Sequence, residues 1–212
     1  MAESKLDGRR LRGERSRDAI LERAVSLAST DGLDGLSLGR LAAAAGVSKS
    51  GFFAHWRDKE ELQLDAIDWA ARQWTDRIVK PALAEPKGVR RIFALHEARL
   101  RFYADGVLPG GCFFFTAQAE FDDRPGPVRD RIAKAMREWL AYLHGLVESA
   151  VALGELPGVD PAQLAFEINA LGEATVAHAR LIDAGTAYAL SRRAVLDRLR
   201  ALTPDPTLLP ED

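Results

Sequence analysis

Residues 37–62, SLGRLAAAAGVSKSGFFAHWRDKEEL, place two short helical segments on either side of a glycine-containing turn. An apolar stripe at helical spacing is formed by Leu38, Leu41, Ala42 and Ala45. Ser37 is a candidate N-cap for this helix, Gly46 can take the left-handed conformation that ends it, and Ser48 can cap the next helix. The pattern predicts a helix-turn-helix, in which the second helix enters the major groove of DNA.

A short amphipathic helical hairpin is more common than a DNA-reading unit, so the spacing alone leaves both interpretations open. The side chains around the turn favour DNA, because Lys49 and Lys59 supply positive charge to phosphates and Gly51 lets the backbone approach a groove. Asp58 is a good N-cap, which places Lys59 at a helix start where a phosphate is favoured. The candidate DNA-binding residues are Ser37, Ser48, Lys49, Ser50, Gly51, Phe53, His55 and Lys59.

The run from Val47 to Leu62 resembles the N-terminal domain of the tetracycline-repressor (TetR) family of bacterial regulators. The matching positions are Val47, Ser48, Lys49, Phe52, His55, Trp56, Lys59, Glu60 and Leu62. Two positions depart from the family pattern. Phe53 stands where tyrosine is usual and lacks the hydroxyl that would bond a phosphate. Arg40 stands where an acid is common, which removes the acidic half of a capping box with Ser37.

Residues 14–60 are predicted to form a DNA-binding domain of three helices, the first of which runs from about Glu14 to Asp31. Phe52 and Trp56 are interpreted as core residues of this domain. His55 could be an ordinary surface histidine, but its place at the end of the presumed recognition helix favours a phosphate contact.

Residues 1–13 are expected to form a flexible basic arm. The first 17 residues hold six Lys and Arg against three Asp and Glu and show no apolar periodicity. A solvated tail is the more common fate of such a run, but beside a helix-turn-helix it could add phosphate or minor-groove contacts. Residues 1–57 hold ten basic against seven acidic residues in a chain of net charge -2, so the basic end is the expected reading end.

Residues 61–203 predict a larger, all-helical ligand-binding and dimerisation domain. Long helices are expected over residues 58–79, 89–105, 127–153, 161–183 and 187–202. The whole chain is therefore expected to be all-α, with about nine helices, and the helix over 58–79 could act as a lever between the domains. Residues 204–212 are expected to be a disordered tail.

Aromatic and histidine side chains of the larger domain could line a cavity for an apolar or aromatic effector, although each is more often core than cavity wall. These candidates are Trp69, Phe93, His96, Tyr103, Phe114, Tyr142, Phe166 and His178. Cys112 is interpreted as a buried small hydrophobe in preference to a redox sensor. The later run EFDDRPGPVR, residues 120–129, is similar to that of a recognisable subset of TetR-like proteins.

The resemblance implies a homodimer in which the last two long helices pair with those of a second subunit. The candidate interface residues are Leu164, Ile168, Leu171, Gly172, Thr175, Val195, Leu199 and Leu202. The same apolar stripes could instead complete the core of a monomer. The need of a helix-turn-helix protein to read two half-sites favours the dimer.

Composition limits the remaining classes of function. The chain has 212 residues, of which 47% are hydrophobic, but no apolar run approaches the ~20 residues that span a bilayer. It also begins without the apolar segment of a secretion signal, so we expect a cytoplasmic protein with no membrane partner. A single cysteine and four scattered histidines predict no metal site, and we expect no cofactor.

The sequence therefore predicts a DNA-binding transcriptional regulator that is not an enzyme. We expect a repressor that binds a pseudo-palindromic double-stranded operator as a homodimer and is released by a small-molecule effector. A helical partner-binding or small-molecule-binding protein without sequence-specific DNA binding is the alternative, but it would leave Ser48, Lys49, His55 and Lys59 unexplained. An enzyme is disfavoured because no histidine lies near Cys112 in the sequence and no phosphate loop or acid pair is present.

Overall fold

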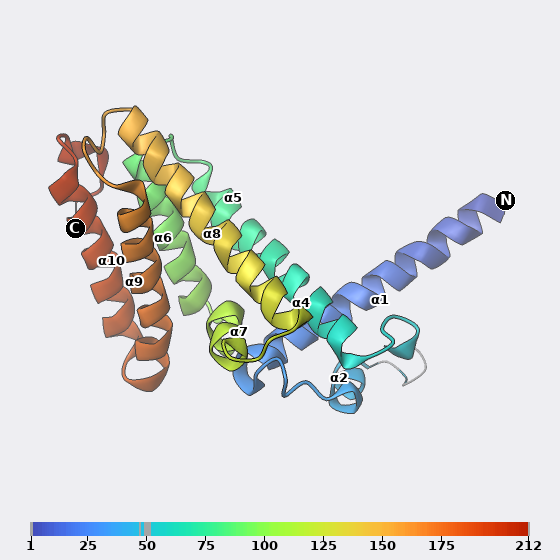
Figure 1. Cartoon of the computed structure of the whole chain (residues 1–212). Coiled ribbons are helices and arrows are strands. Elements are labelled where there is room, and N and C mark those ends of the chain that lie inside the picture. The colour runs from blue at the N-terminus through green and yellow to red at the C-terminus, as the bar shows by residue number, and fades with distance from the viewer. Residues whose placement is uncertain (1, 47, 49–51, 212) are drawn as a thin grey trace. The chain divides into compact units, whose positions relative to one another are not determined.

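The computed structural model describes residues 2–46, 48 and 52–211, with side chains from Gly13 onward, and every regular element in this part is helical (Figure 1). The all-α class is confirmed. The α-helices are α1 (Ala2–Asp31), α2 (Leu38–Ala44), α4 (Lys59–Trp74), α5 (Lys80–Ala82), α6 (Val89–Ala104), α7 (Phe113–Phe121), α8 (Pro127–Ala152), α9 (Pro161–Leu181) and α10 (Ala184–Leu202). A π-helical turn, η1 (Thr75–Val79), continues α4, and a 3-10 turn, η2 (Pro206–Leu208), follows α10. None of the described helices is long and apolar enough to cross a bilayer.

The chain divides into two compact units. The first comprises Met1–Ala71 and Leu108–Ile132, and the second comprises Arg72–Val107 and Ala133–Asp212. These units differ from the predicted division near residue 60, because α7 packs against α1 and belongs to the first unit. Sequence order hides this grouping, since α7 follows α6, a helix of the second unit.

A close approach between α1 and the segment before α7 holds the first unit together. The amide of Gly110 donates to the Oγ atom of Ser29 at 3.0 Å, and Ser29 is fully buried. A Cβ atom at position 110 would lie 1.7 Å from the carbonyl oxygen of Ser29, so a residue with a side chain cannot occupy this position without displacing the backbone.

Helix α1 begins at Ala2, so residues 2–13 are helical where the sequence pattern predicts a flexible arm over residues 1–13. The segment lacks an apolar stripe, which is why its sequence pattern indicates an unstructured arm. It is nevertheless rich in Ala, Leu, Glu, Lys and Arg, which have high intrinsic helix propensities. It extends a helix whose later residues Ile20, Leu21 and Ala24 are buried in the first unit.

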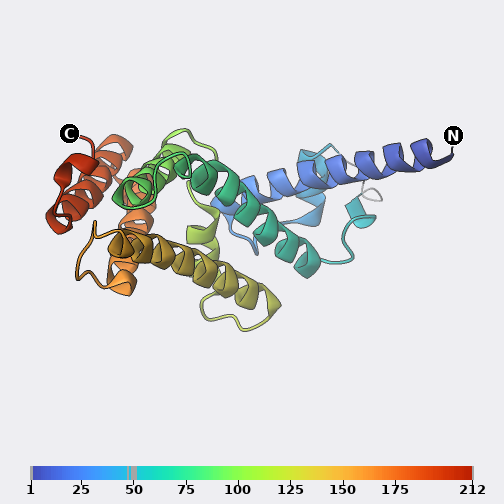
Figure 2. The same ribbon diagram turned by 90° about the horizontal axis from the view of Figure 1, so that it is seen from above.

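The second unit is a helical bundle whose core joins α6, α8, α9 and α10. The core residues are Val89, Ile92, Phe93, Val147, Ala150, Leu156, Leu164, Ile168, Val195, Leu196, Leu199 and Leu209. Helices α9 and α10 lie side by side as an antiparallel pair (Figures 1 and 2). The Asp183 carboxylate accepts a hydrogen bond from the Thr186 amide at 2.6 Å, so α10 begins at Ala184 and not at the predicted residue 187.

The C-terminal segment up to residue 211 includes the turn η2 and packs on the second unit, in contrast to the disordered tail predicted over residues 204–212. Leu209 is 5% exposed and belongs to the core of the second unit. The carbonyl oxygen of Leu208 accepts a hydrogen bond from Nε of Arg90 at 3.0 Å. Two adjacent leucines give this short segment enough apolar surface to dock.

Candidate DNA-reading and effector sites

Helix α2 opens the candidate DNA-reading end of the first unit. The Oγ atom of Ser37 accepts a hydrogen bond from the Arg40 amide at 3.5 Å, so Ser37 is the N-cap of α2 as predicted. The turn after α2 contains Gly46 with φ of +66°, a conformation that glycine adopts without steric cost. The first helix and the turn of the predicted motif are therefore present.

The next part of the motif is described at its two ends. The amide of Phe52 donates to the carbonyl oxygen of Ser48 at 2.9 Å, which is a helical i to i+4 bond. Ser48 is exposed. Val47 and three of the predicted DNA-binding residues, Lys49, Ser50 and Gly51, lie outside the described residues.

Two aromatic residues after the motif form part of the core. Phe52 and Trp56 are each 1% exposed, and their ring centroids lie 5.2 Å apart, which confirms the core prediction. The indole N–H of Trp56 donates to the Asp65 carboxylate at 2.6 Å. The Arg17 guanidinium lies 5.7 Å from the Trp56 ring, so α1 and α4 are both linked to this indole.

The remaining aromatic candidates near the motif face different surroundings. Phe53 is 49% exposed and presents an apolar ring to solvent, where it can make apolar contacts with DNA but cannot donate a hydrogen bond. His55 is half-buried, with its ring centroid 5.4 Å from that of Trp56.

Lys59 is the first residue of α4 and lies at its positive dipole end. The Asp58 carboxylate accepts a hydrogen bond from the Glu61 amide at 2.9 Å, which is consistent with the predicted cap. The ammonium group of Lys59 contacts the Asp34 carboxylate at 2.7 Å and also the Asp34 carbonyl oxygen. Lys59 holds the pKa of that carboxyl below its ordinary value, mainly through this hydrogen bond. A phosphate bound by Lys59 would therefore share the ammonium group with Asp34.

The loop that contains Asp34 is fixed by a carboxylate that the sequence did not single out. Glu120 of α7 accepts hydrogen bonds from the amides of Leu33 at 2.6 Å and of Asp34 at 3.1 Å. Arg124, just beyond α7, contacts the second oxygen of Asp34 at 3.2 Å. Both Glu120 and Arg124 belong to the EFDDRPGPVR run, whose role in the sequence was unassigned.

A buried arginine surrounded by aromatic rings is the main polar feature of the second unit. Arg99 of α6 is 4% exposed. Its guanidinium carbon lies 5.5 Å from the ring of Trp74, 5.8 Å from that of Tyr103 and 5.9 Å from that of Trp139. Nε of Arg99 donates to the Tyr103 hydroxyl at 2.7 Å, and Nη1 contacts two oxygens of Asn169 at 3.3 and 3.4 Å. We call Arg99, Trp74, Tyr103, Trp139 and Tyr142 the arginine cage.

Sequence reasoning missed Arg99, although a signal was present. Arg99 falls on the same face of α6 as Ile92, His96 and Tyr103, at spacings of four, three and four residues. A basic residue within an apolar stripe indicates either a snorkelling surface side chain or a buried functional cation. In the structure the Arg99 side chain is buried, so it is not a snorkelling surface side chain.

His96 lies one turn before Arg99 and is buried. Its Nε2 atom is 3.2 Å from the carbonyl oxygen of Ser191 and 3.2 Å from the Ser191 hydroxyl. Burial, helped by the charge of Arg99, lowers the pKa of His96 from 6.5 to about 3. The imidazole is therefore neutral at physiological pH.

The predicted effector residues are divided between different environments. His96, Tyr103 and Tyr142 lie in the second unit, the latter two within the arginine cage. Phe93 lies in the core beneath Arg192, and Trp69 and Phe114 belong to the first unit. Phe166 is 63% exposed on α9, and His178, also on α9, is exposed.

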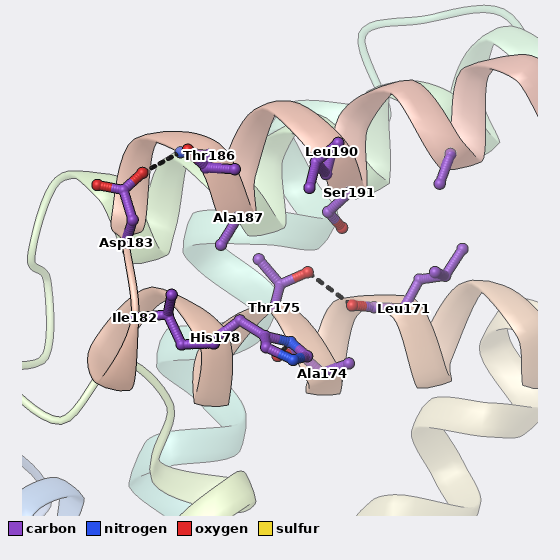
Figure 3. Close-up of a pocket in the computed structure, with 11 residues that line it drawn as sticks. Leu171, Ala174, Thr175, His178, Ile182, Asp183, Thr186, Ala187, Leu190 and Ser191 are labelled. Atoms are coloured by element: carbon purple, nitrogen blue, oxygen red, sulfur yellow. Dashed lines mark hydrogen bonds between the residues drawn. The ribbon is translucent and has the colours of Figure 1, made fainter.

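A groove between α9 and α10 has a volume of about 470 Å³ (Figure 3). It is lined by Leu171, Ala174, Thr175, His178, Ile182, Asp183, Thr186, Ala187, Leu190, Ser191 and Ala194. Large apolar side chains around it are open to solvent, with Ile182 77% and Leu190 62% exposed. Such a contiguous apolar surface is typical of an interaction site.

The structure redistributes the predicted dimer-interface residues. Leu171 and Thr175 line the groove. Gly172 lies beneath the Arg99 guanidinium, and Leu202 packs on the core. The other four residues, Leu164, Ile168, Val195 and Leu199, are core residues of the single chain, so they are corrected as surface contacts. The sequence prediction assigned to the dimer interface the apolar stripes with which α9 and α10 pack inside the single chain.

The described side chains contain no group of three His, Cys, Asp or Glu that could hold a metal ion. The fold and the reading end together define an all-helical DNA-binding regulator of the helix-turn-helix class. A family model described as tetracyclin repressor-like, C-terminal domain, matches residues 88–195. A second, described as bacterial regulatory proteins, tetR family, matches residues 20–66. The chain belongs to the TetR family.

Individual relatives support this assignment. The HTH-type transcriptional regulator SrpR of Pseudomonas putida is 24% identical over 149 residues, which span 68% of this chain and 65% of SrpR. A TetR regulator from Chloroflexus aurantiacus is 27% identical and superposes with a TM-score of 0.83 over 91% of this chain and 98% of its own. AibR, crystallised with isovaleryl coenzyme A and operator DNA, shares the fold at 19% identity, with a TM-score of 0.67 over 89% of this chain and 98% of AibR.

Proposed function

We propose that this protein is a repressor that binds a pseudo-palindromic operator as a homodimer and leaves it when a small organic effector binds the second unit. The proposal rests mainly on the position of Lys59, whose ammonium group lies at the start of α4 and contacts Asp34 in the loop before α2. A cation at a helix N-terminus is suited to a DNA phosphate.

The dimer is supported by the groove between α9 and α10. Four large side chains on or between these helices are strongly exposed: Phe166, Leu181, Ile182 and Leu190. Burying such a surface against a second copy removes apolar area from water, and a two-fold arrangement presents two reading motifs to two half-sites. The second copy is therefore the occupant that we assign to this groove.

Effector control is supported by the membership of α4 in both units. Its first residue, Lys59, belongs to the first unit, and its last residue, Trp74, belongs to the second and to the arginine cage. An effector that binds the operator-incompetent conformation more tightly would shift the population away from DNA. AibR, which has the same fold, holds both operator DNA and an acyl coenzyme A in its crystal structure.

The test is binding of the purified protein to DNA flanking its own gene, followed by selection from random DNA, in a salt series with non-specific competitor. We expect a competitor-resistant shift with a steep salt dependence, weakened in Lys49→Ala and Lys59→Ala. Failure to enrich any sequence from random DNA would overturn the proposal and favour a helical binding protein without operator specificity.

A further inference from the structure

We propose that the arginine cage is the anion-binding part of the effector site and that the effector is a small aromatic carboxylic acid, bound as its carboxylate. This inference rests on the proposed effector control and adds the chemical class of the effector. Three observations carry it: a buried cation, planar apolar walls around it and a buried hydroxyl that lacks a partner.

The cation is positioned to bind a carboxylate. Arg99 is 4% exposed, and its Nη1 atom makes hydrogen bonds of 3.3 and 3.4 Å to the side-chain and backbone oxygens of Asn169. Charge-assisted bonds between a guanidinium and a carboxylate are commonly about 2.7–2.9 Å long and stronger than bonds to a neutral amide. A carboxylate that approached Nη1 would therefore compete well with Asn169.

The walls are suited to an aromatic body. The rings of Trp74 and Trp139 are perpendicular, with centroids 5.4 Å apart, and Tyr142 stacks on Trp139 at 6.2 Å. Trp74, Trp139 and Tyr142 are half-buried, whereas Arg99 is buried. The partly exposed rings thus form a rim around the deeper charge. A fully hydrated inorganic anion would gain little from such a rim, but an aromatic ring can stack or pack edge-on against it.

The unpartnered group is the hydroxyl of Tyr142. Within the described residues this buried oxygen has no hydrogen-bond partner. A buried hydroxyl without a partner is costly, and a polar group of a ligand would relieve that cost. Tyr142 stacks on Trp139, whose ring lies 5.9 Å from the Arg99 guanidinium, so a carboxylate or phenolic oxygen of a ligand at this edge of the cage can accept a hydrogen bond from the hydroxyl.

The experiment measures binding of cinnamate and benzoate to the full-length protein by calorimetry and tryptophan fluorescence. Cinnamamide and benzamide serve as neutral isosteres, and acetate serves as an anion without a ring. We expect the acids to bind saturably and at least about tenfold more tightly, or about 1.4 kcal/mol, than their amides, which lack the charge-assisted pair, and than acetate, which lacks the ring. Equal binding of acid and amide, or absence of acid binding at millimolar concentration, would overturn the proposal.

Two variants locate the site. Tyr142→Phe removes the unpartnered hydroxyl, so we expect about fivefold weaker acid binding with an unchanged or raised melting temperature. Tyr188→Phe, on α10 and outside the cage, is the matched control and should bind as the wild type. Arg99→Gln should abolish the preference for acid over amide. If Arg99→Gln does not fold, Tyr142→Phe still tests the location of the site. Acid binding by Tyr142→Phe with the affinity of the wild type would contradict the assignment of the acid to the arginine cage.

Operator binding by the same preparation separates this inference from the proposed function. An operator shift without acid binding would overturn the acid class and leave the regulator intact. If the acid binds in a manner that depends on Tyr142 but the protein selects no DNA sequence, the repressor proposal would be overturned and the proposed acid-binding site would stand. Release of the operator by cinnamate but not by cinnamamide supports both.

Discussion

The guanidinium of Arg99 lies directly against the backbone of Gly172, where an added Cβ atom would be 2.2 Å from Nη1. We therefore expect Gly172→Ala to displace the buried charge and to lower the free energy of unfolding by about 1–2 kcal/mol, because overpacking outweighs the better helix propensity of alanine. Chemical denaturation measures this change.

The matched control for Gly172 is Gly145, a glycine within α8 where an added Cβ atom would have no neighbouring atom within 4 Å. Gly145→Ala should stabilise the protein by up to about 1 kcal/mol through helix propensity alone. If the two substitutions changed stability equally, Arg99 would not be packed against α9.

His96 predicts a loss of stability in mild acid. Its pKa falls from 6.5 to about 3 on folding, so the unfolded chain takes up a proton first. The stability that depends on a neutral, buried His96 is fully present above about pH 6.5 and is lost as the pH falls toward 3. Between pH 7 and pH 5 we expect a loss of about 2 kcal/mol in the free energy of unfolding, measured by denaturant titration.

The control for the acid effect is a comparison of pH slopes. His96→Gln should flatten the slope between pH 7 and pH 5 even if it lowers stability overall. A His96→Gln variant with the wild-type slope would show that another group causes the acid sensitivity.

Leu209 predicts that the C-terminal segment contributes to stability. Because this side chain is 5% exposed within the core, Leu209→Ala should cost about 2 kcal/mol in thermal or chemical unfolding. Leu153 is 56% exposed, and Leu153→Ala should change stability by less than about 0.5 kcal/mol. Equal, small effects would mean that the segment docks without contributing to stability.

Leu190 tests the proposed dimer surface. Placing a charge in the apolar groove by Leu190→Asp should weaken self-association at least about tenfold, as seen by analytical ultracentrifugation, with a parallel loss of operator affinity. Leu83→Asp changes a leucine that is 48% exposed outside α9 and α10 and should leave the association intact. An unaffected dimer in Leu190→Asp would move the interface elsewhere.

Lys59 tests the reading end. Lys59→Ala should weaken binding uniformly across DNA sequences and reduce the slope of log affinity against log salt by about 0.9. Lys80→Ala is the control, because that lysine pairs with Asp76 in the second unit. An unchanged salt slope in Lys59→Ala would remove its phosphate role.

Substitution of Asp34, the ion-pair partner of Lys59, should change operator affinity in the opposite direction. Asp34→Asn removes a negative charge beside the proposed phosphate site and releases the Lys59 ammonium, so we expect operator binding to tighten about threefold or more, judged by gel shift. Weaker binding would instead mean that Asp34 serves to hold Lys59 in position for DNA.

Local sequence signals predicted the elements well because they depend on near neighbours. Ser37, Gly46 and Asp58 act through hydrogen bonds or backbone conformations within one helical turn, so their roles follow from residue type and spacing. The core positions Phe52 and Trp56 followed equally from spacing. At residues 2–13 the sequence pattern was misleading, because helix propensity counted for more there than the missing apolar stripe.

By itself the sequence determined the all-helical class and, apart from the start of α1, the boundaries of the long helices to within a few residues, since these follow from periodicity and capping. Tertiary structure decided which faces are buried. It placed α7 with the first unit, turned the stripes of Leu164 and Val195 inward, and buried Arg99 among aromatic rings. These outcomes depend on contacts between residues far apart in the chain, and an apolar stripe records only that a face is covered, not which partner covers it.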